Sequence, residues 1–266
     1  MDKIDGQKIA ETIYFRINSN AKRGLKLVVI MAGNNPSTES FVAQKRKAAF
    51  RTGVDFEILR LSADASTNEI ENIVRQASEN PLITAIVVQL PLPAQIDRER
   101  VIRAIAPEKD ADSLNKGRLS APAVGVVTEI ISFLRKDIES LNFTVIGYGQ
   151  LVGRPIYEFL LKRAKSVSLL RKGDNLVDGI KGADVIITGT GNPGLIKADI
   201  LHEGAIVIDF GYGLTSDGKL SGDFSPGVST KQIYYTPTPS GTGPILVAKL
   251  FENIYNLDSK LPFSRE

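Results

Sequence analysis

Short runs rich in β-branched residues alternate with amphipathic segments along the sequence, and this alternation constrains the fold more than any other feature. The pattern is typical of a parallel sheet whose strands are joined by helices, so we predict the α/β class. The expected strands are 25–31, 55–61, 83–89, 143–147, 166–170, 184–188 and 205–210. The expected helices are 7–22, 38–52, 66–79, 97–105, 123–137, 151–163, 174–181 and 243–257.

Two stretches interrupt the alternation and indicate domain boundaries. One lies between Pro107 and Pro122, and the other is the proline- and glycine-rich segment 235–244. A chain of 266 residues is long enough for two modest domains. We predict a discontinuous first domain with an inserted Rossmann-like domain, a doubly wound parallel sheet, and a ligand cleft between the two. The predicted limits are 1–121 plus 244–266 for the first domain and 122–243 for the second.

The composition excludes several classes of function. The chain has no cysteine, which removes disulfides, thiolate nucleophiles and cysteine zinc sites, and we expect no metal. The only histidine, His202, lies at the expected end of a short helix, where the helix dipole favours histidine, so we expect a structural role over a catalytic one. A net charge of +3 with dispersed basic residues argues against nucleic acid. The sequence shows no apolar run long enough to span a membrane and no recognisable signal peptide. We therefore expect a cytoplasmic protein.

A glycine turn follows the expected strand at 143–147. Gly147, Tyr148, Gly149 and, four residues later, Gly153 lead into the next helix. Glycines in such a turn let the backbone approach a pyrophosphate, whose charge then lies at the helix N-terminus. The spacing is one residue longer than the common dinucleotide fingerprint, and an ordinary glycine turn remains an alternative. The turn predicts a nicotinamide dinucleotide site and an oxidoreductase.

The next strand, 166–170, ends in Arg171 and Lys172 instead of an acidic residue. Basic side chains at this position suit a 2′-phosphate, so we predict NADP as the cofactor; the alternative is two solvated loop charges. Further glycine loops follow the strands at 184–188 and 205–210, on the same predicted edge of the sheet. From these loops we add three residues to the cofactor site: Thr190, Gly191 and Gly211.

The first half of the chain carries a second group of candidate residues. Phe41 and Lys45 are four residues apart on an expected helix, so they share a face and could flank a planar substrate. Gln89 ends an apolar strand, and Asp112 lies in the first boundary segment. Lysine can exchange protons near neutral pH when burial or other cations lower its pKa. A solvated surface lysine is the alternative interpretation of Lys45.

These motifs together resemble the methylenetetrahydrofolate dehydrogenase/methenyltetrahydrofolate cyclohydrolase family, and the resemblance runs nearly end to end. The motifs are Phe41-x-x-x-Lys45, Val88-Gln-Leu-Pro-Leu-Pro93, Pro107-Glu-Lys-Asp-Ala-Asp112, Val152-Gly-Arg-Pro155 and Thr236-Pro-Thr-Pro-Ser-Gly-Thr-Gly-Pro244. The resemblance implies oxidation of methylenetetrahydrofolate with NADP and hydrolysis of the methenyl product to formyltetrahydrofolate. It also implies a homodimer acting in one-carbon metabolism and purine biosynthesis.

The resemblance further assigns roles to individual residues. Lys45 matches the essential cyclohydrolase lysine, Gln89 its partner and Asp112 the carboxylate that hydrogen-bonds the pterin. The residues expected to bind the folate are Thr38, Phe41, Pro239, Gly241 and Pro244.

Several positions depart from the family pattern, and they lie in the substrate and cofactor loops. They are Phe41 for Tyr, Thr38 for Ser, Gly149 for Ser, Ser113 for Gly, Ser120-Ala-Pro-Ala123 for Pro-Cys-Thr-Pro, and Ser240-Gly-Thr for Gly-Gly-Val. Two alternatives therefore stay open. One is a monofunctional dehydrogenase, which the missing Tyr hydroxyl suggests. The other is a folate- or nucleotide-binding relative without catalytic activity.

Overall fold

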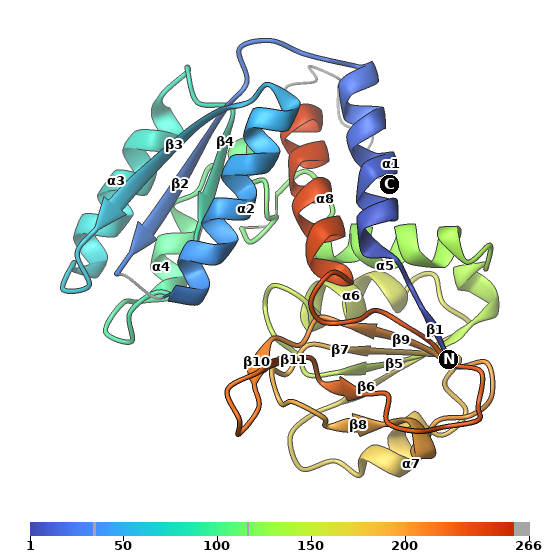
Figure 1. Cartoon of the computed structure of the whole chain (residues 1–266). Coiled ribbons are helices and arrows are strands. Elements are labelled where there is room, and N and C mark those ends of the chain that lie inside the picture. Colours follow the sequence, from blue (N-terminus) through green and yellow to red (C-terminus); the bar gives the residue numbers. More distant parts are fainter. Residues whose placement is uncertain (34–35, 116, 258–266) are drawn as a thin grey trace. The chain divides into compact units, whose positions relative to one another are not determined.

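The computed structural model describes residues 1–33, 36–115 and 117–257 and divides the chain into two compact units (Figure 1). Unit 1 comprises residues 1–12 and 123–246, and unit 2 comprises residues 13–122 and the C-terminal residues from 247. Residues 1–12 belong to unit 1 because strand β1 (Asp2–Lys3) pairs with β13 (Tyr234–Tyr235). The domain limits expected from the sequence remain a prediction.

Unit 2 contains a three-stranded parallel sheet of order β3-β2-β4. The central strand is β2 (Lys26–Ala32), flanked by β3 (Asp55–Leu61) and β4 (Ala85–Val88). Val29 of β2 pairs with Ile58 on one side and Val87 on the other. β2 and β4 are almost wholly apolar and buried, as expected of parallel strands covered by helices on both faces.

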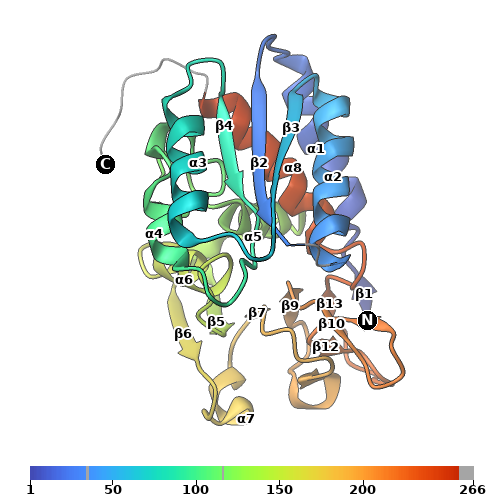
Figure 2. The ribbon, with the colours of Figure 1, turned by 90° about the vertical axis from the view of Figure 1, so that its left-hand side faces the viewer.

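Helices cover both faces of this sheet (Figure 2). On one face, α3 (Thr67–Glu79) and α4 (Arg98–Arg103) form an apolar core with β2 and β4. The side chain of Ser66 caps α3 by accepting a hydrogen bond from the Glu69 amide at 3.2 Å. α2 (Pro36–Thr52) lies on the opposite face, where the Tyr255 hydroxyl of α8 (Thr242–Leu257) donates to the Thr52 carbonyl. Helix α1 spans Gly6–Ser19, and the 3₁₀ helix η1 spans Pro107–Lys109.

Unit 1 contains a six-stranded, all-parallel sheet of order β1-β13-β9-β7-β5-β6. Its long strands are β5 (Asn142–Ile146), β6 (Ser166–Leu170), β7 (Val185–Thr188) and β9 (Ile206–Asp209). The chain adds β6 on one side of β5 and then β7 on the other, so the strand order reverses at β5. In doubly wound sheets, ligands bind outside the carboxyl ends of the strands at such a reversal.

Apart from α5, the remaining elements of unit 1 are short. The helices are α5 (Pro122–Phe133), α6 (Gly153–Leu160) and α7 (Leu176–Ile180), with 3₁₀ helices η2 (Ile138–Ser140) and η3 (Ala198–Ile200). β8 (Ile196–Lys197) pairs with β12 (Phe224–Ser225), and β10 (Gly213–Leu214) pairs with β11 (Leu220–Ser221).

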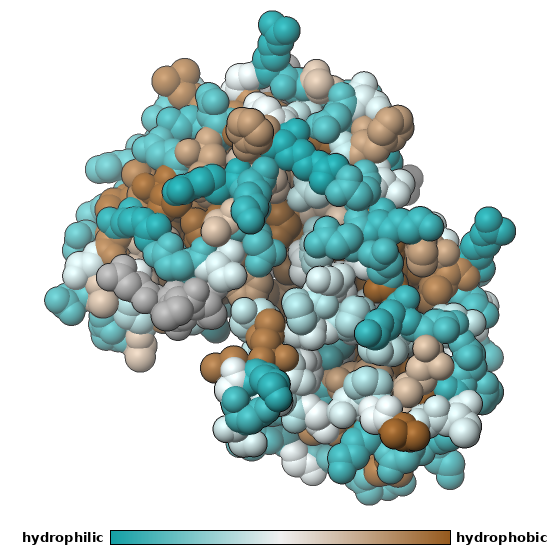
Figure 3. Space-filling view, viewed as in Figure 1, coloured by the Kyte–Doolittle hydropathy of each residue, from teal (hydrophilic) through white to brown (hydrophobic). Residues whose placement is uncertain are grey.

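The structure confirms the α/β class, and every expected strand and helix is present; the strands at 55–61 and 166–170 have the expected limits, and the other elements are shifted by a few residues. The two-residue strands β1, β8 and β10 to β13 were missed, because two residues cannot display an alternating pattern. On the face shown in Figure 3, hydrophobic residues are interrupted by hydrophilic ones. In the described part of the chain, no helix has the length and apolar character needed to cross a membrane.

Candidate active site

Lys45 and Gln89 are brought together in unit 2, although 44 residues separate them in the sequence. Lys45 projects from α2, and Gln89 follows the last residue of β4. The Lys45 Nζ donates a hydrogen bond to Gln89 Oε1 at 2.7 Å. Gln89 Nε2 donates to the Leu90 carbonyl at 2.9 Å, and this second bond fixes which end of the amide faces the lysine. The predicted pairing of these two residues is therefore present.

Asp112 interacts electrostatically with Lys45, so the three predicted catalytic residues form one cluster. Burial lowers the pKa of the Lys45 ammonium, and the charge of Asp112 acts in the opposite direction. Burial likewise raises the pKa of the Asp112 carboxyl, and the charge of Lys45 opposes that change. A lysine with a lowered pKa gives up its proton more readily, which suits it to exchange a proton with a substrate or water.

The loop that carries Asp112 is organised by Asp110, which is fully buried. Asp110 pairs with Ile86 of β4 as an isolated parallel bridge, and its Oδ2 accepts the Asn115 amide at 2.6 Å. Burial raises the pKa of Asp110 to about 6, while backbone donors such as Asn115 oppose the increase. Sequence reasoning missed this residue, although its place in the Lys-Asp-Ala-Asp string was a usable signal.

Ser113, which stands where the family has glycine, adopts φ 56°. This left-handed conformation favours glycine, so serine is strained there. Its hydroxyl donates to the Leu119 carbonyl at 2.6 Å, which ties the strained residue to the following chain. The loop therefore adopts, with serine at position 113, the left-handed conformation that favours glycine.

Thr38 and Phe41 lie on the first turns of α2, ahead of Lys45 on the same helix. Thr38 is buried, and its Oγ1 finds no hydrogen-bond partner among the residues that the structure describes. A buried hydroxyl without a partner is costly, so this atom is suited to bonding a ligand. Phe41 is half-buried and stands one turn before Lys45.

Pro239, Gly241 and Pro244 belong to unit 1, beside the loop that follows β9. The neighbouring hydroxyls of Thr238 and Thr242 donate to the carbonyls of Gly211 and Asp209, respectively. Gly241 has no room for a side chain, because a Cβ would lie 2.4 Å from the Pro237 carbonyl oxygen. The structure places these three residues but does not test their predicted contact with folate.

The glycine turn after β5 has a separate requirement at each position. Gly147 has φ +88°, a conformation that L side chains rarely adopt. A Cβ on Gly153 would lie 2.1 Å from the Gly147 carbonyl oxygen, so only glycine lets α6 start this close to the strand. At Gly149, no described atom lies within 4 Å of a Cβ. The chain itself therefore does not require glycine there, and this position leaves room for a ligand.

Arg171 and Lys172 follow β6 and are exposed. The Arg171 guanidinium lies over the Tyr148 ring, with Cζ 5.0 Å from the ring centroid. The structure therefore joins the predicted basic residue to the predicted glycine turn.

Thr190 and Asn192, which flank Gly191 in the loop after β7, are held by the buried carboxylate of Asp223. Asp223 Oδ2 accepts bonds from the Thr190 amide at 2.7 Å, the Thr190 hydroxyl at 3.0 Å and the Thr188 hydroxyl at 2.6 Å. Its Oδ1 accepts the Asn192 amide at 2.7 Å. Sequence reasoning missed Asp223, because it lies in a turn-rich segment without strand or helix periodicity.

Gly211, in the next loop, packs against the same carboxylate. A Cβ there would lie 2.4 Å from Asp223 Oδ1. The neighbouring Asp209 ends β9 and accepts the Gly211 amide at 2.6 Å and the Phe224 amide at 2.8 Å. Burial raises the pKa of Asp209 to about 6, against the effect of these backbone donors. The buried carboxylates of Asp209 and Asp223 thus hold the predicted cofactor loops by accepting hydrogen bonds from them.

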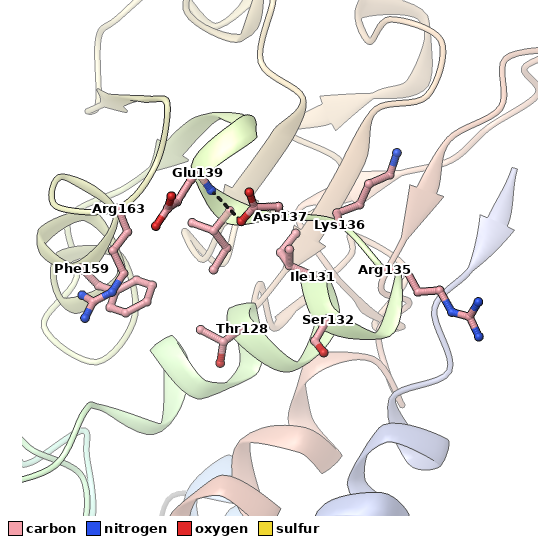
Figure 4. Close-up of a pocket in the computed structure, with 10 residues that line it drawn as sticks. Thr128, Ile131, Ser132, Arg135, Lys136, Asp137, Glu139, Phe159 and Arg163 are labelled. Atoms are coloured by element: carbon pink, nitrogen blue, oxygen red, sulfur yellow. Dashed lines mark hydrogen bonds between the residues drawn. The ribbon is translucent and has the colours of Figure 1, made fainter.

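Two other features lie apart from these residues. A pocket of about 490 Å³ in unit 1 is lined by α5, the turn after it and α6, and it includes none of the predicted site residues (Figure 4). In Figure 4, Arg135 and Lys136 extend away from Thr128 and Phe159. His202 is exposed, and its ring nitrogens contact the carbonyls of Glu203 and Ala183, which agrees with the predicted structural role.

Known proteins share both halves of this arrangement. Residues 4–112 match the catalytic domain, and residues 120–261 the NAD(P)-binding domain, of tetrahydrofolate dehydrogenase/cyclohydrolase. The chain belongs to the tetrahydrofolate dehydrogenase/cyclohydrolase family. The bifunctional protein FolD of Lactobacillus delbrueckii subsp. bulgaricus is 35% identical to it, over 96% of each chain.

Solved structures of family members agree. The dehydrogenase-cyclohydrolase (FolD) of Trypanosoma brucei, solved with NADP cofactor and an inhibitor, has a TM-score of 0.90 at 27% identity and 96% coverage of both chains. The bifunctional FolD of Campylobacter jejuni has a TM-score of 0.88 at 29% identity, covering 95% of this chain and 96% of that one.

Membership of the family confirms the predicted tetrahydrofolate dehydrogenase and cyclohydrolase activities. It also confirms a nicotinamide dinucleotide cofactor, because the second family domain binds NAD(P). The roles of the individual residues remain predictions.

Proposed function

We propose that this chain performs both family reactions in sequence, with Lys45, Gln89 and Asp112 carrying the hydrolytic one. Methylenetetrahydrofolate is first oxidised to methenyltetrahydrofolate with NADP, and water then converts the methenyl product to formyltetrahydrofolate. The observation that carries the proposal is the 2.7 Å hydrogen bond between Lys45 Nζ and Gln89 Oε1, combined with the nearby charge of Asp112.

In the hydrolytic step, Lys45 handles the proton of the attacking water. The methenyl carbon is electron-poor, so water adds to it and must lose a proton as the new C–O bond forms. Burial favours the neutral Lys45 amine, which accepts that proton and returns it to the ring nitrogen that leaves when the C–N bond breaks. The remaining hydroxyl proton is released to solvent as the C=O bond of the formyl group forms. The Gln89 Oε1 atom accepts a hydrogen bond from Lys45 Nζ and so holds the amine in one orientation. Asp112 holds the pterin, as the resemblance implies.

In the oxidative step, the chain mainly binds and orients its ligands. NADP, when bound, supplies the hydride-accepting chemistry. The glycine turn fits a dinucleotide, because Gly153 lets the helix start close to the strand and Gly149 leaves open space over the turn. The loops at Thr190 and Gly211 line the same carboxyl edge of the sheet. Hydride transfer then requires the folate carbon and the nicotinamide to be held in contact.

Arg171 and Lys172 are proposed to favour NADP over NAD. Both side chains are exposed after β6, where an acidic residue would instead bind a free ribose diol. Steady-state rates with methylenetetrahydrofolate and each cofactor test this proposal. We expect a higher kcat/KM with NADP, and a higher value with NAD would overturn it.

A second candidate is a dehydrogenase without cyclohydrolase activity, and Phe41 is the observation that favours it. Phe41 stands one turn from Lys45 and has no hydroxyl, whereas the family has tyrosine there. Accumulation of methenyltetrahydrofolate that decays only at the uncatalysed rate would support this candidate. Restoring the hydroxyl with Phe41→Tyr would then be expected to restore hydrolysis.

We also propose a cytoplasmic homodimer that provides formyl groups for purine biosynthesis. The family resemblance supports this proposal. Sedimentation equilibrium at micromolar concentration tests the assembly, and a mass equal to one 28.9 kDa chain would contradict it.

A further inference from the structure

Tyr148 lies at the tip of the glycine turn, and its ring contacts the basic residue after the next strand. The Arg171 Cζ is 5.0 Å from the Tyr148 ring centroid. A cation within about 6 Å of an aromatic centroid is attracted by the negative face of the ring. Sequence reasoning placed both residues at the cofactor site without linking them.

The Tyr148 ring is itself held in place by α6. Its hydroxyl donates to Glu158 Oε1 at 3.4 Å, and the same oxygen accepts Arg154 Nε at 2.9 Å. The Tyr157 ring meets the Tyr148 ring edge-on, with centroids 6.1 Å apart and planes 77° apart. The Tyr148 side chain remains exposed, at 39%. The ring is therefore a fixed support at the surface of the turn.

A hydrogen bond fixes the backbone of Arg171, while the N–H donors of its guanidinium form no ion pair with a carboxylate of the described residues. The Arg171 amide donates to Asp174 Oδ2 at 2.7 Å, which shapes the loop after β6. Within residues 1–33, 36–115 and 117–257, no carboxylate forms an ion pair with the Arg171 guanidinium. Its N–H groups thus remain available to an anion, and a planar guanidinium is suited to bind a phosphate through two bonds at once.

We propose that Tyr148 is a positioning residue for the 2′-phosphate of NADP, acting by holding the Arg171 guanidinium over its ring. This inference rests on the proposed preference for NADP. A guanidinium already stacked on a ring loses less freedom when it binds a phosphate, so the ring increases affinity for the phosphorylated cofactor. NAD has no 2′-phosphate and gains nothing from this arrangement. Tyr148 thereby contributes to the choice of cofactor and leaves the hydride transfer unchanged.

The test compares two fragments of the cofactors by calorimetry, so it needs no enzymatic activity. The fragment 2′,5′-ADP carries the 2′-phosphate, and 5′-AMP lacks it. In Tyr148→Leu, we expect the Kd of 2′,5′-ADP to rise about 3- to 10-fold and the Kd of 5′-AMP to change less than about 2-fold. Tyr148→Phe keeps the ring and should retain the wild-type ratio of the two Kd values.

Two further variants separate the possible causes. Phe159→Leu is the matched control, because it removes the ring under another exposed cation, Arg163, whose Cζ lies 4.7 Å from the centroid. It should leave both Kd values unchanged. Arg171→Ala should weaken 2′,5′-ADP selectively, and adding Tyr148→Leu to it should produce no further change in the ratio, because the ring acts through the arginine.

The outcomes separate the role of Tyr148 from the NADP preference on which it rests. Suppose that Arg171→Ala is selective but Tyr148→Leu weakens both fragments equally or neither. The NADP preference then stands and the role of Tyr148 is overturned; equal weakening would instead mean that the ring contacts the adenine. If the wild type does not discriminate the fragments, the NADP preference itself fails and this inference fails with it. If the wild type discriminates them but Arg171→Ala is not selective, the preference stands without Arg171 and the role of Tyr148 is overturned.

Discussion

The two candidate sites in this chain are built in opposite ways. In unit 2, the proposed chemistry belongs to side chains: Lys45 in the middle of a helix, Gln89 just after a strand and Asp112 in a loop. In unit 1, the predicted cofactor site is mostly backbone, and its loops are shaped by the carboxylates of Asp209 and Asp223. As proposed, the first site therefore depends on proton chemistry, whereas the second depends on the shape of loops.

This difference predicts how each site responds to mutation. Removing a side chain in unit 2 should abolish one reaction and leave the fold intact. Removing a supporting carboxylate in unit 1 should weaken cofactor binding whether or not the cofactor carries a 2′-phosphate.

The largest expected effect is that of Lys45→Met. Without a proton-transfer group, the cyclohydrolase rate should fall about 10²- to 10⁴-fold, while hydride transfer keeps most of its rate. Methenyltetrahydrofolate decay and NADPH formation are measured separately by absorbance. Lys47→Met, at an exposed position on the same helix, is the control and should behave as wild type. Equal loss of both activities in Lys45→Met would remove the distinction between the sites.

Asp223→Asn should have the next largest effect. The replacement puts an NH₂ group where an oxygen accepts donated hydrogen bonds, so the loop at Thr190 loses its support. We expect a decrease of about 2 kcal/mol in the free energy of unfolding. The KM values for NADP and NAD should rise by similar factors, with methenyl hydrolysis largely retained. The exposed Asp217→Asn is the control, and a selective effect on NADP alone would contradict the support role.

Asp110→Asn should give an effect on stability that depends on pH. The folded-state pKa of about 6 lies above the usual value of 3.8, so between pH 4 and 6 the folded chain retains a proton that the unfolded chain has lost. The wild-type contribution to stability therefore falls as pH rises through this window and is constant above it. Relative to wild type, Asp110→Asn should gain stability from pH 4 to 7, by at most about 3 kcal/mol. Urea unfolding at both pH values measures the difference, and a gain on acidification would have the wrong sign.

The smallest expected effect is that of Gly149→Ser, which restores the family residue. A Cβ at this position meets no described atom within 4 Å, so stability should change by less than about 0.5 kcal/mol. Gly153→Ser is the contrasting variant, because its Cβ would collide with the Gly147 carbonyl. Thermal melts of both variants check the prediction. A large destabilisation by Gly149→Ser would mean that glycine is required there.

The same contrast explains what could be predicted from the sequence. The long strands and helices follow from hydrophobic periodicity, and Lys45, Gln89 and Asp112 lie in recognisable strings attached to those elements. Asp223 could not be found this way, because its partners in the loop at 188–192 are more than 30 residues away and its own segment has no period. The contact between Tyr148 and Arg171 was also invisible, since it depends on the pairing of β5 with β6.

The most direct measurement is a single progress curve of the wild-type chain with methylenetetrahydrofolate and NADP. Absorbance follows NADPH and methenyltetrahydrofolate, and chromatography of the quenched mixture gives formyltetrahydrofolate. The two-site account predicts that formyltetrahydrofolate appears in step with NADPH and that methenyltetrahydrofolate stays at a low steady level. Methenyltetrahydrofolate accumulating in equal amount to NADPH, with formyltetrahydrofolate formed only at the uncatalysed rate, would contradict it.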